Sequence, residues 1–253
     1  MKLLVCIKQT FDTEEKIELK EGEIVEETSQ WIVNPYDEYA IEEALRLKEE
    51  HGGEVIVLTI GKERSESALR HGLAMGADHA VLIEDVESDE FIISKVIAAY
   101  AKDKNFDFIL TGNQSIDNGA GQVGVRVAEE LSIPHITSVV KLQIENQRVL
   151  AERDVEGETY KVETPLPVLV TCQQGLNEPR YPSLPNIMKA KRKSLEHLDV
   201  SDLIEKSVDT SKKTNVVERY KPKKRKACTR IEGEPSVASQ KLVKLLFEEA
   251  KIF

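Results

Sequence analysis

The sequence lacks the features of membrane, secreted and disulfide-rich proteins. No apolar run reaches the ~18–20 residues that a membrane-spanning helix needs. Met1–Lys8 is too short, and becomes charged too early, to be a signal peptide. The cysteines, Cys6, Cys172 and Cys228, are far apart and form no C-x-x-C motif. We therefore expect a cytoplasmic chain that is not embedded in a membrane and has no disulfide framework or zinc site.

Catalytic motifs are missing too. The phosphate-binding pattern G-x-x-x-x-G-K-[ST] is absent, which disfavours a free-standing ATP-binding or AMP-forming protein. The histidines are scattered along the chain, and none forms a recognisable motif with a cysteine or serine: His51, His71, His79, His135 and His197. We expect no catalytic residue and no metal site on this chain.

The negative charge is unevenly distributed. The formal net charge is −10, yet residues 189–253 carry 17 lysines and arginines against 10 acidic residues. The basic clusters are Lys189–Lys193 and Lys221–Lys226. A basic tail can bind nucleic acid, but the first 188 residues hold 18 basic against 35 acidic residues. We therefore favour an arm that docks on an acidic surface, in this chain or a partner, and expect no nucleic acid.

The first half of the chain alternates strands with helices. Short apolar runs predict strands at Leu3–Ile7, Val55–Ile60, Ala80–Ile83 and Phe106–Thr111. Amphipathic patterns predict helices over 35–50, 65–75, 90–102 and from about Ala120 to Leu131. This order indicates an α/β fold with a mostly parallel sheet and helices on both faces. Such sheets bind ligands beyond the carboxyl ends of their strands. The loops Ile7–Gln9, Asn34–Asp37, Ile60–Gly61 and Gly112–Val123 could converge there.

The loop Gly112–Val123 is the strongest candidate for a binding site. A strand that passes through a glycine-rich loop into a helix leaves backbone N–H groups free at the helix start, which favours a phosphate. Gly112, Gly119 and Gly121 would permit close approach. Gly119–Gly124 matches G-x-G-x-x-G, but a polar loop separates it from its strand, so a plain NAD fingerprint is rejected. The interpretations that remain are a nucleotide site and an ordinary strand-to-helix loop.

The second half changes character. Period-two patterns predict strands at 139–144, 149–153, 159–162 and 168–172, continuing the sheet as antiparallel strands. A proline-rich stretch then leads into a helix predicted over Ile187–Leu195. Residues 199–235 lack a core face and predict an extended arm. A terminal helix at Ser236–Glu249 carries enough apolar surface to require a partner. We divide the chain into a nucleotide-binding α/β domain (1–195) and an arm with its helix (196–253).

Two segments carry a resemblance to a known family. Arg153–Gly157 (RDVEG) and Asn177–Lys191 (NEPRYPSLPNIMKAK) resemble the signature of the electron transfer flavoprotein β subunit. The likeness extends to Lys8-Gln9, Asn34-Pro35 and the loop 112–124, and covers nearly the whole chain in the same order.

The resemblance implies a Rossmann-like fold of the adenine nucleotide α-hydrolase type and an αβ heterodimer. The α subunit would hold FAD and carry electrons from acyl-CoA or other flavin dehydrogenases towards a quinone reductase. The β subunit would bind AMP, or a second FAD in electron-bifurcating relatives, which also have an NADH site. The resemblance implies these nucleotide contacts: Cys6, Asn34, Pro35, Tyr36, Asp37, Ile60, Gly112, Asn113, Gln114, Ser115, Ile116, Asp117, Asn118, Gly119, Ala120, Gly121, Gln122 and Val123.

A recognition loop for the dehydrogenase is also implied. It corresponds to Tyr181, Pro182, Ser183, Leu184, Pro185, Asn186, Ile187, Met188, Lys189 and Ala190, with Leu184 at its centre. Judged from its pattern alone, Leu184 would be an ordinary core residue. Thr13 stands where some relatives carry an aromatic residue, and Asn118–Gly121 is less acidic than the loop of many bifurcating relatives. These departures favour AMP and a non-bifurcating electron carrier, with the bifurcating form as the alternative.

Overall fold

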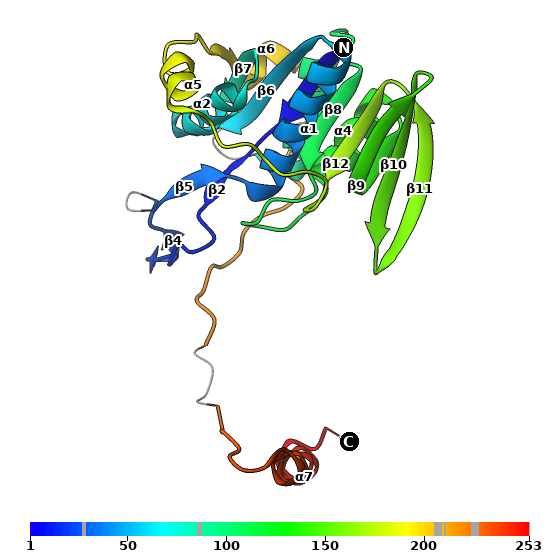
Figure 1. The fold of residues 1–253 in the computed structure, drawn as a ribbon. Helices are drawn as coiled ribbons and strands as arrows, with labels where there is room; N and C mark the ends of the chain where they lie inside the picture. Colours follow the sequence, from blue (N-terminus) through cyan, green and yellow to red (C-terminus); the bar gives the residue numbers. More distant parts are fainter. Residues whose placement is uncertain (27–28, 85–87, 205–208, 210, 224–227, 253) are drawn as a thin grey trace.

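A mostly parallel sheet of nine strands forms the centre of the computed structural model, which describes residues 1–26, 29–84, 88–204, 209, 211–223 and 228–252 (Figure 1). Its strand order is β11-β10-β9-β12-β8-β1-β6-β7-β13. The strands are β1 (Lys2–Cys6), β6 (Glu54–Gly61), β7 (His79–Glu84), β8 (Phe108–Gly112), β9 (His135–Glu145), β10 (Arg148–Val155), β11 (Glu158–Pro165), β12 (Val168–Cys172) and β13 (Glu196–Asp199). The predicted α/β fold is confirmed.

Helices cover both faces of this sheet because alternate strand residues point to opposite sides. Leu3 and Val5 of β1 join the core under one pair of helices, whereas Leu4 and Cys6 join the core under the other. The first pair is α1 (Pro35–His51) and α2 (Glu66–Met75), and the second is α3 (Glu90–Ala101) and α4 (Val123–Leu131). The predicted helix at residue 120 thus begins three residues later, at Val123.

The direction in which the chain adds strands to the sheet reverses beside β1. From β1 the chain builds β6 and then β7 on one side, and from β7 it crosses back to place β8 on the other side of β1. Open α/β sheets bind ligands where the strand order reverses in this way. The carboxyl ends of β1 and β8 therefore mark the expected ligand position.

The antiparallel extension is confirmed for β9, β10 and β11, but not for β12. After β11 the chain returns to the interior of the sheet, where β12 lies parallel to both β8 and β9. All five residues of Val168–Cys172 are buried. A continuous apolar run is typical of a parallel strand that is covered on both faces, which explains why period two was the wrong pattern here.

Two short ribbons lie between β1 and α1. The strands β2 (Gln9–Phe11) and β5 (Trp31–Val33) pair with each other, and β3 (Leu19–Lys20) and β4 (Glu23–Ile24) form a hairpin. At the first ribbon Phe11 lies against Trp31, with ring centroids 4.1 Å apart.

The segment after β12 is fixed to α1 by Arg180. The Arg180 guanidinium donates to Glu42 at 2.8 and 2.9 Å and to Glu49 at 2.6 and 3.2 Å. Asn177 Nδ2 donates to Glu43 Oε2 at 2.9 Å. Glu42 and Glu43 are buried, so these paired contacts compensate the loss of hydration of both carboxylates. Part of the segment 177–191, which resembles the family signature, therefore has a structural role in anchoring the chain.

The helix predicted over Ile187–Leu195 lies further towards the N-terminus, as α5 (Leu184–Ala190). Ser183 caps it by accepting the Asn186 N–H at 3.4 Å, and Pro185 occupies its first turn. Proline is well tolerated there because the first helical N–H groups have no partner within the helix. The prolines thus mark the start of the helix rather than an irregular lead-in.

Beyond residue 195, the predicted end of the α/β domain, the chain first stays on the sheet. β13 pairs with β7, and α6 (Val200–Leu203) packs against α3. Further along the arm, Asp89 accepts the backbone N–H groups of Lys213 and Thr214 at 2.6 and 3.0 Å. Arg219 then forms an ion pair with Glu23 of β4 at 2.9 Å. Of the basic cluster Lys221–Lys226, residues 224–226 lie outside the described residues.

The terminal helix lies apart from the rest of the chain (Figure 1). It is α7 (Pro235–Leu245), continued by a π-helical turn at Leu246–Ala250. Val237, Val243 and Phe247 are more than half exposed. Among the described residues, no helix is both long enough and apolar enough to cross a bilayer.

Candidate functional site

A cavity of about 260 Å³ lies at the reversal of the strand order. Its floor is formed by the carboxyl ends of the central strands, with Cys6 of β1, Ile60 of β6 and Thr111 of β8. The loop 112–122 and the start of α4 form one wall, and α3 contributes Ile93 and Ile97 to another. The cavity therefore combines an apolar wall with a polar loop and a helix N-terminus.

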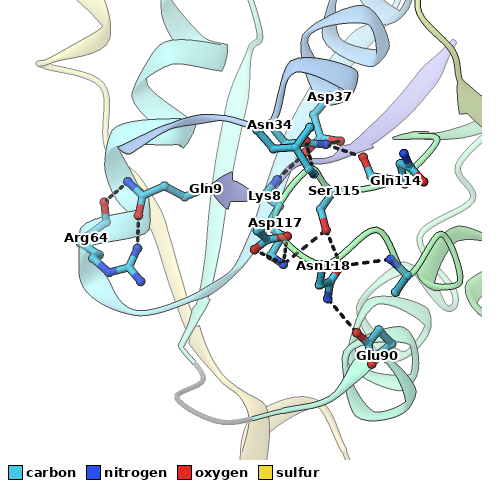
Figure 2. A network of polar contacts seen from close by, with 12 residues as sticks. Lys8, Gln9, Asn34, Asp37, Arg64, Glu90, Gln114, Ser115, Asp117 and Asn118 are labelled. Atoms are coloured by element: carbon cyan, nitrogen blue, oxygen red, sulfur yellow. Dashed lines mark hydrogen bonds and ion pairs between the residues drawn. The ribbon is translucent and has the colours of Figure 1, made fainter. Parts of the chain in front are cut away.

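The buried carboxylate of Asp37 ties three segments together beside this cavity (Figure 2). Its Oδ2 accepts the backbone N–H of Lys8, just after β1, at 2.6 Å. Its Oδ1 accepts the N–H of Gly112, at the end of β8, at 3.0 Å. Asp37 itself lies in the first turn of α1, where the helix dipole favours a negative charge. One side chain thus fixes the ends of two adjacent parallel strands against a helix.

Burial dominates the electrostatics of this carboxylate. Loss of hydration raises the pKa of Asp37 to about 7, although hydrogen bonds from Asn34, Lys8 and Gly112 and the charge of Lys8 act in the opposite direction. Burial also raises the pKa of the Cys6 thiol, as does the nearby charge of Asp37. Cys6 is therefore a neutral thiol at the cavity floor.

Asn34 holds the loop through its backbone. Its Nδ2 donates to the Gln114 carbonyl at 2.9 Å and to Asp37 Oδ1 at 3.0 Å, and its Oδ1 accepts the Ile116 N–H at 3.1 Å. Asn34 directly precedes α1, where asparagine is a common cap, but its side chain does not cap that helix. Its polar groups are used to position residues 114–116 instead.

A second network closes the outer side of the loop (Figure 2). Lys8 Nζ forms an ion pair with Asp117 at 2.7 Å. Asn118 accepts from Ser115 Oγ at 2.8 Å and donates to Glu90 Oε1 of α3 at 2.8 Å. Burial acts to raise the pKa of Asp117, but Lys8 and hydrogen bonds within the loop hold it below its ordinary value. The loop is therefore fixed to β1 at one end and to α3 at the other.

The start of α4 is the part of the cavity best suited to an anion. The residue before the helix, Gln122, gives it no side-chain cap, and its first turn has no acidic residue. The cavity is lined by Val123 and Gly124 of this turn. Uncapped N–H groups and a positive dipole end favour a phosphate at such a position.

The glycines have different roles from those expected. A side chain at Gly112 would overlap Asp37 Oδ1 and Tyr36 Cβ, so this glycine makes room for the Asp37 carboxylate rather than for a ligand. Gly119 and Gly121 adopt φ values of +63° and +59° within the loop. At Gly124, a Cβ would lie 3.0 Å from the side chains of Thr111 and Thr171. Helix–sheet packing therefore accounts for Gly124, the last glycine of the G-x-G-x-x-G match.

The structure brings most of the predicted nucleotide contacts to this cavity. Those that line it are Cys6, Asn34, Asp37, Ile60, Gly112, Asn113, Gln114, Ser115, Asn118, Ala120, Gly121, Gln122 and Val123. The remaining predicted residues are not among its lining residues: Pro35, Tyr36, Ile116, Asp117 and Gly119. Asp117 faces Lys8 instead, and Ile116 contributes a backbone N–H to Asn34.

The wall from α3 was missed by the sequence interpretation. Ser88, Glu90, Ile93 and Ile97 line the cavity. A signal was present, because Glu90–Ala101 is apolar on more than one side. A helix of that kind has to cover more than one surface. Here Ile92 and Val96 pack into the core, while Ile93 and Ile97 face the cavity.

The predicted recognition loop forms a separate surface. Tyr181 is 97% exposed and Leu184 is 79% exposed, so the interpretation of Leu184 as a core residue is wrong. Ala190 is buried, and Arg70 of α2 donates to its carbonyl at 3.0 Å. The exposed apolar residues thus stand on a short helix that is anchored at its C-terminal end.

Comparison with known proteins assigns the family. The profile of the electron transfer flavoprotein domain matches residues 22–203. The electron transfer flavoprotein subunit beta of Bacillus subtilis is 53% identical over 256 residues, covering all of both chains. This chain belongs to the electron transfer flavoprotein β-subunit family. A β subunit of this family is an electron transfer subunit and not itself a catalytic enzyme.

Other relatives extend the similarity. The subunit beta of Syntrophomonas wolfei is 37% identical over 254 residues, covering 100% of this chain and 98% of its own. The chain is also 41% identical, over 75% of each chain, to subunit CarD of the caffeyl-CoA reductase–Etf complex of Acetobacterium woodii. In the part of the chain that the structure describes, no group of three or more histidine, cysteine, aspartate or glutamate side chains could hold a metal ion.

The raised pKa of Asp37 predicts a pH-dependent contribution to stability. In the unfolded chain an aspartate loses its proton near pH ~4, whereas in the folded chain Asp37 keeps it up to a pH of about 7. Between these values the folded state binds more protons, so the contribution of Asp37 to the unfolding free energy falls as pH rises and levels off above pH 7.

The test compares the wild type with Asp37→Asn by urea unfolding between these two pH values and above them. The wild-type unfolding free energy minus that of the variant should shrink by about 2–4 kcal/mol over this window. Taking the difference removes the effect of the other titrating groups. A difference that is constant with pH would show that the pKa of Asp37 is not raised.

Proposed function

We propose that this chain is the β subunit of an αβ electron transfer flavoprotein and binds AMP in the cavity between β1 and β8. The observation that carries this proposal is the uncapped N-terminus of α4, which lines the cavity at the reversal of strand order. FAD, held by the α subunit, would accept electrons from a dehydrogenase and pass them towards a quinone reductase. The role of this chain is then to hold AMP, support the α subunit and dock the donor.

The lining residues fit an adenine nucleotide. Backbone N–H groups at Val123 and Gly124 would bind the phosphate, and Asn113 and Gln114 offer polar groups for the ribose or base. Ile60, Ile93 and Ile97 supply the apolar surface that a purine ring requires. AMP bound here would pair N–H groups that otherwise stay unsatisfied, which gives it a structural function.

The size of the cavity favours AMP over FAD. Its volume of about 260 Å³ is small, since pockets for drug-sized ligands usually measure roughly 300–1,000 Å³. FAD contains the whole of AMP joined to a flavin mononucleotide and would need considerably more space. The contact between Asn118 and Glu90 also closes the loop onto α3.

A bifurcating β subunit with FAD in this cavity and an NADH site is the second candidate. It is favoured by the 41% identity to a subunit of the caffeyl-CoA reductase–Etf complex. The higher identity of the Bacillus subtilis protein, over the full length of both chains, favours the simple β subunit.

Two other surfaces suit protein partners. The exposed Tyr181, Leu184 and Met188 lie beside the basic residues 189–193, which suits brief docking of an acidic dehydrogenase surface. The apolar side chains of α7 lie away from the core of this chain and suit burial against the α subunit.

The nucleotide content of the purified αβ complex tests the proposal. After acid denaturation we expect one FAD and one AMP for each heterodimer, because the cavity is small and suits the smaller nucleotide. Two FAD and no AMP would support the bifurcating alternative, and NADH oxidation would then be assayed. Neither nucleotide in stoichiometric amount would contradict a nucleotide site in this cavity.

Substitution of Leu184 tests the docking surface. Burying one leucine contributes roughly 1.5–3 kcal/mol, so Leu184→Ala should raise the Michaelis constant for this protein as electron acceptor at least about tenfold. Val217→Ala, at a residue 96% exposed on the arm, is the control and should have little effect. A Leu184 variant with unchanged kinetics would exclude this surface from docking.

A further inference from the structure

Arg153, near the end of β10, has a guanidinium that no carboxylate of the described residues pairs with. Its guanidinium donates one hydrogen bond, from NH2 to Thr137 Oγ1 at 2.7 Å. Its Nε is buried and has no hydrogen-bond partner. Among the described residues, no carboxylate forms an ion pair with it, and neighbouring Glu152 faces Lys141 and Lys161. Arg153 is partly exposed and stays charged, so its unpaired donor is available to an external anion.

The local backbone is built to hold Arg153 in this position. The pairing of β9 with β10 shifts register between Glu152 and Arg153, and such bulges re-aim the side chains beside them. In the facing strand Ser138 has a φ of +56°, which is unfavourable for a residue with a side chain. Ser138 is fixed there because its N–H donates to Thr171 Oγ1 at 3.0 Å and its Oγ donates to Asn113 Oδ1 at 3.2 Å.

An exposed aromatic residue stands directly opposite. Arg153 and Tyr160 are register partners in the antiparallel pair of β10 and β11, so both side chains project from the same face. Tyr160 is 50% exposed. Arginine and tyrosine are the residue types most enriched at the energetic centres of protein interfaces. The pair thus has the composition of a binding point.

The position of this pair decides which partner it suits. Arg153 does not line the nucleotide cavity, so a ligand there cannot be its anion. The predicted recognition loop leads into α5, which packs on α2 near the opposite end of the sheet, far from β11 (Figure 1). A partner that leaves after each electron transfer would expose the unpaired guanidinium again. A permanently bound subunit would not.

We propose that Arg153 and Tyr160 form a docking point for a surface carboxylate of the α subunit. A carboxylate matches the planar guanidinium through paired hydrogen bonds, and Nε is one of the donors of that fork. This inference rests on the proposed pairing with an α subunit. The sheet edge at β11 would then serve assembly, while the surface around Leu184 stays free for electron donors.

The test compares Arg153→Gln with the wild type in two measurements on the full chain. In titrations against immobilised α subunit, the dissociation constant should rise by about 30-fold or more, as expected when one member of a buried charge pair is removed. In urea unfolding of the β chain alone, the midpoint should stay unchanged or increase, because an uncompensated charge is lost. Binding should also depend less on ionic strength in the variant.

Two further variants make the outcome decisive. Arg148 lies on the same strand as Arg153 and forms an exposed ion pair with Glu163 of β11. Arg148→Gln removes this pair and should weaken binding less than about fivefold. Tyr160→Ala changes a half-exposed side chain and should weaken binding about tenfold even if Arg153→Gln fails to fold.

Wild-type binding of α by Arg153→Gln or by Tyr160→Ala would overturn the inference. So would a loss of β-chain stability as large as the loss of binding, because it would show a purely structural role for Arg153. Failure of the wild-type chain to bind α would instead contradict the proposed function.

Discussion

The hydrogen bonds to the Asp37 carboxylate hold the cavity together. They join the end of β1, the end of β8 and the first turn of α1, which are far apart in the sequence. Position 112 requires a glycine because the Asp37 carboxylate occupies the space that a side chain there would fill. Asn34 extends this hydrogen-bond network to the loop at Gln114 and Ile116. Without the network, the reversal of strand order would leave an open crevice rather than a walled cavity.

Much of this arrangement could be predicted from local patterns. The alternation of strands and helices predicted the parallel sheet. Because ligands bind beyond the carboxyl ends of such strands, it also predicted that the loops after β1, β6 and β8 lie together. The patterns failed where distant contacts decide the structure. β12 pairs with β8, and β13 pairs with β7, although each partner is more than 50 residues away in the sequence, and no local pattern records such pairings. Similarly, Asn34 reads as a helix cap, but contacts 80 residues away determine its role.

The three candidate surfaces lie at separate places on the chain and, on the proposed function, would have separate tasks. The cavity lies at the carboxyl ends of the central strands, so a nucleotide there would join several segments and stabilise the fold. The exposed Leu184 stands on a short helix near the opposite end of the sheet from β11. Arg153 offers a guanidinium whose buried Nε is unpaired, and α7 offers an exposed apolar face, and both suit a lasting partner. On the proposed function, separate surfaces would let one subunit remain assembled while electron donors exchange.

The most direct test of this account is the binding of AMP to nucleotide-free chain by isothermal titration calorimetry. We expect one AMP to bind to each chain. Asn34→Ala should bind at least about tenfold more weakly, because the Gln114 carbonyl and the Ile116 N–H lose their partner and the loop is released. Absence of binding to the wild type, or equal binding by the variant, would contradict the claim that this braced loop forms the nucleotide site.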